Sequence, residues 1–149
     1  GLVNASGRVG TGLYSDRIGR ANAYLINGLV SAVCLFLMPS IMGSGNVALL
    51  FLAVGVAYWQ YGGGLALMPA LTADFFGSKS LGFNYGLVFI GWGMAFFVPQ
   101  VAGYLKDATG SLSATFTLSG VLLTAAVIVS QLLRRPLARG EAPGHGQAA

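Results

Sequence analysis

Asn4 and Arg8 are the first residues in the chain whose types and spacing could do chemistry. They stand four positions apart in the run G-L-V-N-A-S-G-R, so a helix would place both side chains on one face. A guanidinium is a planar fork that binds a carboxylate through two hydrogen bonds, and an amide could add one to a neighbouring hydroxyl or keto group. Because an arginine at membrane depth costs about 2.5–3.5 kcal/mol, it usually faces a polar cavity or an anion. We therefore expect Arg8 and Asn4 to bind a small organic anion; the alternative is that Arg8 snorkels to the lipid headgroups.

Two tyrosines form a second candidate group. Tyr58 and Tyr61 precede three consecutive glycines in the run Y-W-Q-Y-G-G-G, well inside a long apolar stretch. Interfacial aromatic residues lie near the ends of a span, whereas these tyrosines would lie near its middle, where their hydroxyl groups could contact a substrate. The glycines would let this helix bend and pack tightly against a neighbour.

A short cluster of charge and glycine separates two apolar segments near the start of the chain. Its order is Gly-x-x-x-Asp-Arg-x-Gly-Arg, formed by Gly12, Asp16, Arg17, Gly19 and Arg20. The glycines allow a tight turn that other residues would resist. The cluster therefore predicts a cytoplasmic loop between two membrane helices. The simpler alternative is a helix-capping turn with a local Asp–Arg pair.

Composition places the chain in a lipid bilayer. Hydrophobic residues make up 55% of the 149 and charged residues 8%, with a mean hydropathy of +0.73, whereas a soluble domain carries about 25% charge. The prediction is an all-α polytopic membrane bundle over residues 1–133. Thirteen residues cover only about 20 Å of a hydrocarbon core of about 30 Å, so we expect one partial span and four complete ones. The expected spans are about 1–13, 22–42, 47–71, 82–105 and 111–133.

The placement of lysine and arginine predicts the orientation of these spans. One set of loops and the C-terminal tail holds Arg17, Arg20, Lys79, Arg134, Arg135 and Arg139, and the opposite side holds Lys106. By the positive-inside rule, the first side is cytoplasmic. We expect a multi-pass protein of the cell inner (plasma) membrane, with a disordered cytoplasmic tail over 134–149. Asp74 and Lys79 are expected to pair in an inner loop.

Several classes of protein are disfavoured by what the spans contain. The expected spans hold no carboxylate and no histidine, so we expect no enzyme and no catalytic residues. The single Cys34 and the tail residue His145 predict no metal site, and nothing in the chain calls for a cofactor. The positive charge follows the loops and forms no basic face with aromatics, so nucleic acid is not an expected partner. Asn27 is expected to make a helix–helix hydrogen bond.

The charge cluster resembles the loop signature of the major facilitator superfamily. The later runs A-L-M-P-A-L-T-A-D-F-F-G-S-K and P-Q-V-A-G-Y-L-K-D-A-T-G-S look like the oxalate/formate antiporter family, which is monocarboxylate-transporter-like, within that superfamily. The resemblance implies the C-terminal part of a twelve-helix secondary carrier whose two halves rock about a central site. It also implies that Arg8, with Asn4, binds the substrate carboxylate, and that the 12–20 loop helps to latch the inner side. The first six helices would belong to the missing N-terminal half of the same protein.

One departure from the family pattern bears on the substrate. Oxalate-handling members place a lysine a few residues after Asn-Tyr-Gly, but here Trp92 stands at or next to that position. A single arginine neutralises one carboxylate, and a dianion would carry an unpaired charge into low dielectric. We therefore expect a monocarboxylate such as lactate, pyruvate or formate, coupled to a proton or an exchanged anion. Trp92 and Phe89 would form an apolar wall of the site, or simply pack. Oxalate/formate exchange, a sugar or drug carrier, and a structural or channel-like assembly are the alternatives.

Overall fold

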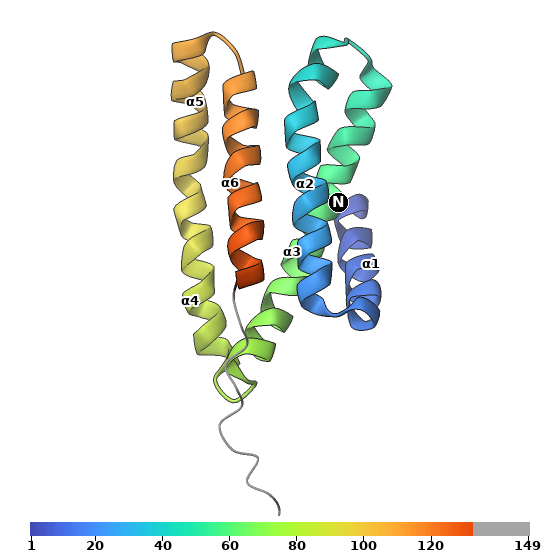
Figure 1. The fold of residues 1–149 in the computed structure, drawn as a ribbon, viewed down its shortest axis with the longest axis vertical. Coiled ribbons are helices and arrows are strands. Elements are labelled where there is room, and N and C mark those ends of the chain that lie inside the picture. The colour runs from blue at the N-terminus through green and yellow to red at the C-terminus, as the bar shows by residue number, and fades with distance from the viewer. Residues whose placement is uncertain (133–149) are drawn as a thin grey trace, which may run out of the picture.

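The chain is an all-α bundle, as a computed structural model of residues 1–132 shows (Figure 1). Four stretches are long and apolar enough to cross a membrane, which confirms the expected number of complete spans: Arg20–Gly43, Val47–Phe76, Leu81–Thr109 and Ser113–Leu132. The elements are α1 (Leu2–Ile18), α2 (Arg20–Gly43), α3 (Val47–Phe76), α4 (Leu81–Met94), η1 (Ala95–Phe97), α5 (Val98–Thr109) and α6 (Ser113–Leu132). The predicted tail, with Arg134, Arg135, Arg139 and His145, lies outside the described residues.

The predicted loop over residues 12–20 is wrong in extent. Helix α1 continues through Gly12, Asp16 and Arg17 to Ile18, and α2 begins at Arg20. Gly19 alone breaks the helix, because its φ of 87° lies in a region that side-chain-bearing residues rarely adopt. A polar last turn does not end a helix, and Arg17 is placed there favourably for the helix dipole.

Helices α1 and α3 cross at very short range because both carry glycine at the contact. A Cβ added to Gly7 would overlap the carbonyl oxygen of Trp59, and a Cβ added to Gly62 would overlap the carbonyl oxygen of Asn4. A Cβ on Gly63 would overlap the hydroxyl of Thr11. The tight packing expected of the glycine run is therefore confirmed at Gly62 and Gly63.

Helix α2 lies between α3 and α6 and uses the same kind of contact. A Cβ on Gly28 of α2 would overlap the Val127 side chain of α6, and a Cβ on Gly120 of α6 would come within 2.9 Å of the Phe36 ring. In a bilayer, where apolar burial gives helices little reason to associate, such close approach gains van der Waals contact. The glycines therefore set the positions of α1, α2, α3 and α6.

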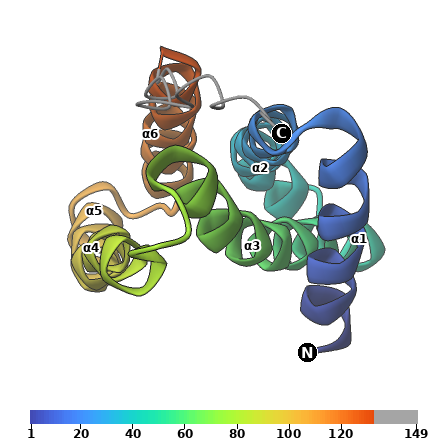
Figure 2. The same cartoon turned by 90° about the horizontal axis from the view of Figure 1, so that it is seen from below.

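Helices α4 and α5 form one long rod interrupted by the short 3₁₀ segment η1 (Figure 1). Pro99 stands in the first turn of α5, where its missing N–H costs no intrahelical bond. Seen from below, α3 runs between α1 on one side and α4 on the other, and α2 and α6 lie beyond it (Figure 2). This arrangement leaves one side of α3 facing the space between α1 and α4.

Candidate functional site

Arg8 and Asn4 form a hydrogen-bonded pair on α1. Arg8 Nε donates to Asn4 Oδ1 at 3.1 Å, so the predicted shared face is confirmed as a direct contact. Asn4 Nδ2 in turn donates to the backbone carbonyl oxygen of Tyr58 on α3 at 3.5 Å. The pair therefore connects α1 to the α3 turn that carries the predicted tyrosines.

Tyr58 and Tyr61, whose side chains are exposed, line an open depression of about 410 Å³ together with Ala57. Gly62, one turn after Tyr58 on α3, packs against α1. Tyr61, also one turn after Tyr58, contacts α4. The Tyr61 ring lies 5.6 Å from the Trp92 ring of α4, centroid to centroid. The two tyrosines thus span the side of α3 that lies between α1 and α4.

Three aromatic rings on α4 form a row that begins beside Tyr61. Phe89 and Trp92 stack nearly parallel, with centroids 5.9 Å apart and planes at 9°. Tyr85, one turn earlier, lies 5.7 Å from Phe89 and extends the row. The sequence interpretation missed Tyr85, although its position four residues before Phe89 places it on the same helix face.

Hydrogen bonds, one shared depression and ring contacts link the six residues that were predicted to bind substrate, and the link from Asn4 to Tyr58 is made to the Tyr58 backbone. This run of contacts passes in this order: Arg8, Asn4, Tyr58, Tyr61, Trp92 and Phe89. The cation stands at one end of the run and the stacked rings at the other.

Arg8 differs from the other cations of residues 1–132 in its place along a helix. It stands ten residues before the end of α1, which corresponds to about 15 Å of helical rise. Arg17, Arg20, Lys79 and Lys106 all lie in the first or last turn of a helix or between helices. The predicted span ends at Leu13, five residues and about 7.5 Å of helical rise after Arg8, so Arg8 lies inside the expected span and not at its boundary.

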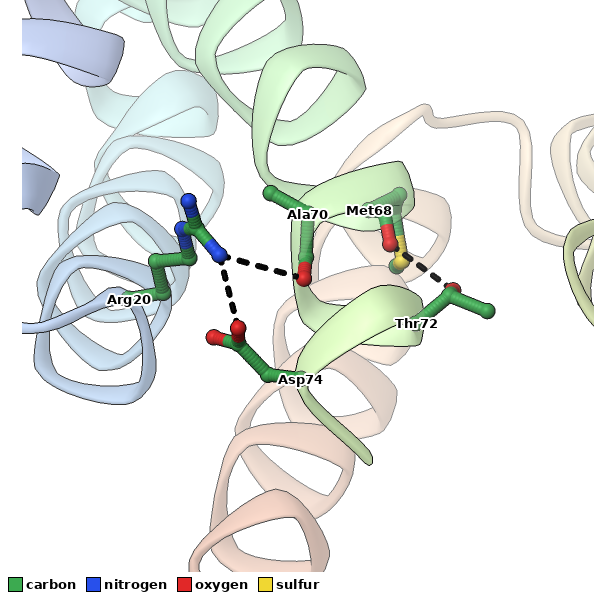
Figure 3. A network of polar contacts seen from close by, with 5 residues as sticks. All are labelled: Arg20, Met68, Ala70, Thr72 and Asp74. Atoms are coloured by element: carbon green, nitrogen blue, oxygen red, sulfur yellow. Dashed lines mark hydrogen bonds and ion pairs between the residues drawn. The ribbon is translucent and has the colours of Figure 1, made fainter. Parts of the chain in front are cut away.

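The end of the bundle at which α1 turns into α2 carries an ion pair that differs from the predicted one. Arg20 Nη1 lies 2.7 Å from Asp74 Oδ1, and the same nitrogen donates to the carbonyl oxygen of Ala70 at 3.5 Å (Figure 3). The prediction that Asp74 pairs with Lys79 is therefore wrong, because the last turn of α3 passes the first turn of α2. Thr72, in the same turn of α3, bonds back to the Met68 carbonyl oxygen at 2.8 Å (Figure 3).

A buried polar junction joins α1, α2 and α3 below the candidate site. Asn27 Nδ2 donates to the carbonyl oxygen of Gln60 at 3.2 Å, which confirms the expected helix–helix bond. The hydroxyl of Thr11 is fully buried there, beside Gly63. Sequence reasoning missed Thr11, and its only signal was a small polar residue one turn after Arg8 in an apolar run.

Comparison with known proteins identifies relatives for most of the chain. An uncharacterized MFS-type transporter of Escherichia coli (strain K12), YhjX, is 30% identical over 93 residues, which cover 62% of this chain and 23% of that protein. The oxalate:formate antiporter of Oxalobacter formigenes is 28% identical over 127 residues, covering 72% and 30%. Monocarboxylate transporter 12 of Xenopus laevis is 28% identical over 151 residues, covering 93% and 32%.

The chain thus spans about a third or less of the length of these relatives. Neither a family model nor a solved structure matches it. The relatives are all named as transporters, and four helices of this chain can cross a membrane. The chain is therefore a multi-pass membrane protein and a homologue of major facilitator superfamily transporters, among them the oxalate:formate antiporter and monocarboxylate transporter 12.

Proposed function

We propose that the chain forms part of a secondary carrier that moves a small monocarboxylate across the membrane by alternating access. Arg8 would bind the carboxylate, and the aromatic residues would enclose the rest of the molecule. The names of two relatives, an oxalate:formate antiporter and a monocarboxylate transporter, support this class of substrate. Lactate, pyruvate and formate are the favoured acids.

The observation that carries this proposal is the place of Arg8 within α1, where it bonds to Asn4 beside the Tyr58 carbonyl oxygen. It stands about 7.5 Å of helical rise before the end of the predicted span at Leu13, and so would lie inside the membrane. A guanidinium at that depth needs a polar cavity or an anion beside it. The open depression of about 410 Å³ at Tyr58 and Tyr61 is in the size range of small-molecule sites.

The surroundings of Arg8 support a single charge on the substrate. The opposite end of the contact run is built from Trp92 and Phe89, which cannot neutralise a second carboxylate. A dianion would leave one charge without a partner in low dielectric. Tyr58 and Tyr61 could donate hydroxyl hydrogen bonds to a keto or hydroxyl oxygen of the substrate.

The remaining elements of the carrier are also proposals. The end of the bundle with Arg17, Arg20 and Lys79 would face the cytoplasm, and the protein would lie in the cell inner (plasma) membrane. An N-terminal half of six helices would complete the site from the other side. A proton or an exchanged anion would be coupled to transport.

Uptake by the complete carrier in proteoliposomes tests the proposal. Radiolabelled lactate, pyruvate, formate and oxalate would be supplied singly, and each would be challenged with the others, with a sugar and with a cationic drug. Saturable uptake of a monocarboxylate, competed by its analogues alone, is the expected result. Preference for oxalate would require a second cation from outside this chain, and uptake of the sugar or the drug alone would contradict a carboxylate carrier.

A further inference from the structure

We propose that Asn4 is a positioning residue for Arg8 and not a ligand of the transported anion. The inference rests on the proposed carboxylate function and reassigns one of its predicted ligands. Both polar atoms of the Asn4 amide already have partners: Oδ1 accepts from Arg8 Nε, and Nδ2 donates to the Tyr58 carbonyl oxygen. One N–H of Nδ2 and one lone pair of Oδ1 remain, but the two bonds already hold the amide against Arg8 and α3.

The partners also fix the orientation of the amide. An arginine Nε can only donate and a backbone carbonyl can only accept. Rotating the amide by 180° would place donor against donor at Arg8 and acceptor against acceptor at Tyr58. Asn4 therefore has one favourable orientation, which ties the arginine to the backbone of α3.

The tie determines which edge of the guanidinium is available. Of the five N–H groups of arginine, the one on Nε is taken by Asn4 at 3.1 Å. The four N–H groups on Nη1 and Nη2 form the outer edge of the fork. A carboxylate would therefore bind end-on, through one N–H of each terminal nitrogen.

Close helix packing holds Asn4 in place. Its carbonyl oxygen lies where a Cβ on Gly62 would be, and the Trp59 carbonyl lies where a Cβ on Gly7 would be. The α1 backbone cannot move toward α3 at these points, and a larger residue at either glycine would push the helices apart. The distance from Asn4 to the Tyr58 carbonyl is thus set by the backbone.

A neutral residue suits this role because it orients the arginine without cancelling its charge. A carboxylate at position 4 would form an ion pair with Arg8 and compete with the substrate anion. It would also face the Tyr58 carbonyl oxygen with two acceptors and no donor. Asn4→Asp and Asn4→Ala should therefore weaken substrate binding for different reasons.

The test measures KM and Vmax for lactate and for formate with the complete carrier in proteoliposomes. Formate has no hydroxyl or keto group that Asn4 could contact. Asn4→Ala should raise KM for both acids by a similar factor, about ten-fold for one lost charge-assisted hydrogen bond, with little change in Vmax. Asn4→Asp should raise KM further. Asn22→Ala is the matched control, since the exposed Asn22 bonds only back to the Ile18 carbonyl of the preceding helix, at 2.8 Å.

Three outcomes would overturn the assignment. A KM increase confined to lactate would make Asn4 a direct ligand of the hydroxyl group. A lowered Vmax with unchanged KM in both variants would make it a packing residue. If Asn4→Ala had wild-type kinetics while Arg8→Lys inactivated the carrier, Asn4 would have no positioning role, but Arg8 would still bind the carboxylate. If Arg8→Lys were also silent, the proposed function itself would fail.

Discussion

Arg20 and Asp74 form an ion pair that fastens the first turn of α2 to the last turn of α3, with 2.7 Å between Nη1 and Oδ1 (Figure 3). Arg20 closes the glycine- and charge-rich motif and would be expected to act at the inner gate. Its bond to the Ala70 carbonyl oxygen, at 3.5 Å, directs it to the same turn of α3. The pair thus braces two helices within this chain.

A double-mutant cycle on Arg20→Ala and Asp74→Ala would measure the coupling free energy between these two side chains. The two side chains are 36% and 24% exposed, so solvent screens the pair and the coupling free energy should be about 1 kcal/mol. Thermal unfolding of the detergent-solubilised carrier provides the measurement, with the exposed Arg17→Ala as control. Additive single effects would show that the pair contributes nothing to stability.

Gly62→Ala should destabilise the carrier by about 1–3 kcal/mol, because the added Cβ overlaps the Asn4 carbonyl oxygen and forces α1 away from α3. Gly64→Ala is the matched control, since a Cβ there meets nothing within 4 Å on the same helix. The melting temperature of each variant, compared with the parent, checks the prediction. Equal effects at both glycines would contradict the close crossing.

Trp92→Lys should change the charge selectivity of the site. The new ammonium group would stand beside Tyr61 and Phe89, opposite the arginine, and could neutralise a second carboxylate. Uptake of oxalate should rise relative to lactate in a competition assay, while Trp92→Phe should keep the parent preference. An unchanged ratio of oxalate to lactate uptake in Trp92→Lys would show that Trp92 does not lie beside the substrate.

Tyr61→Phe and Tyr61→Ala separate the hydroxyl of Tyr61 from its ring. If the hydroxyl donates to the substrate, Tyr61→Phe should raise the KM for pyruvate several-fold, as expected for one lost hydrogen bond. Tyr61→Ala should be worse, because the ring also contacts Trp92 at 5.6 Å. Parent-like uptake kinetics in both variants would remove Tyr61 from the site.

The sequence was sufficient to predict the elements because the bilayer constrains them so strongly. Long apolar runs of this kind form helices in lipid. The run of Gly62, Gly63 and Gly64 predicted that two helices cross closely. The pairing of Arg8 with Asn4 followed from their i and i+4 spacing.

One error had a local cause, and the others came from contacts between residues distant in sequence. The charged motif looked like a loop because local reasoning treats charge and glycine as a break, yet only Gly19 has a positive φ there. The partner of Asp74 was sought five residues away, at Lys79, but stands 54 residues away, at Arg20. Neither the bond from Asn4 to the Tyr58 carbonyl nor the burial of Thr11 could be read from sequence, since both depend on how closely α1 approaches α3.

The most direct test of the account is lactate uptake by the complete carrier and its Arg8→Lys variant in proteoliposomes. Lysine keeps the charge but loses the planar fork and the Nε bond to Asn4. The account predicts saturable uptake in the parent and a loss of at least about ten-fold in uptake efficiency in the variant, as expected when a bidentate, charge-assisted contact is removed. Unchanged uptake in the Arg8→Lys variant would contradict the assignment of Arg8 as the carboxylate-binding residue.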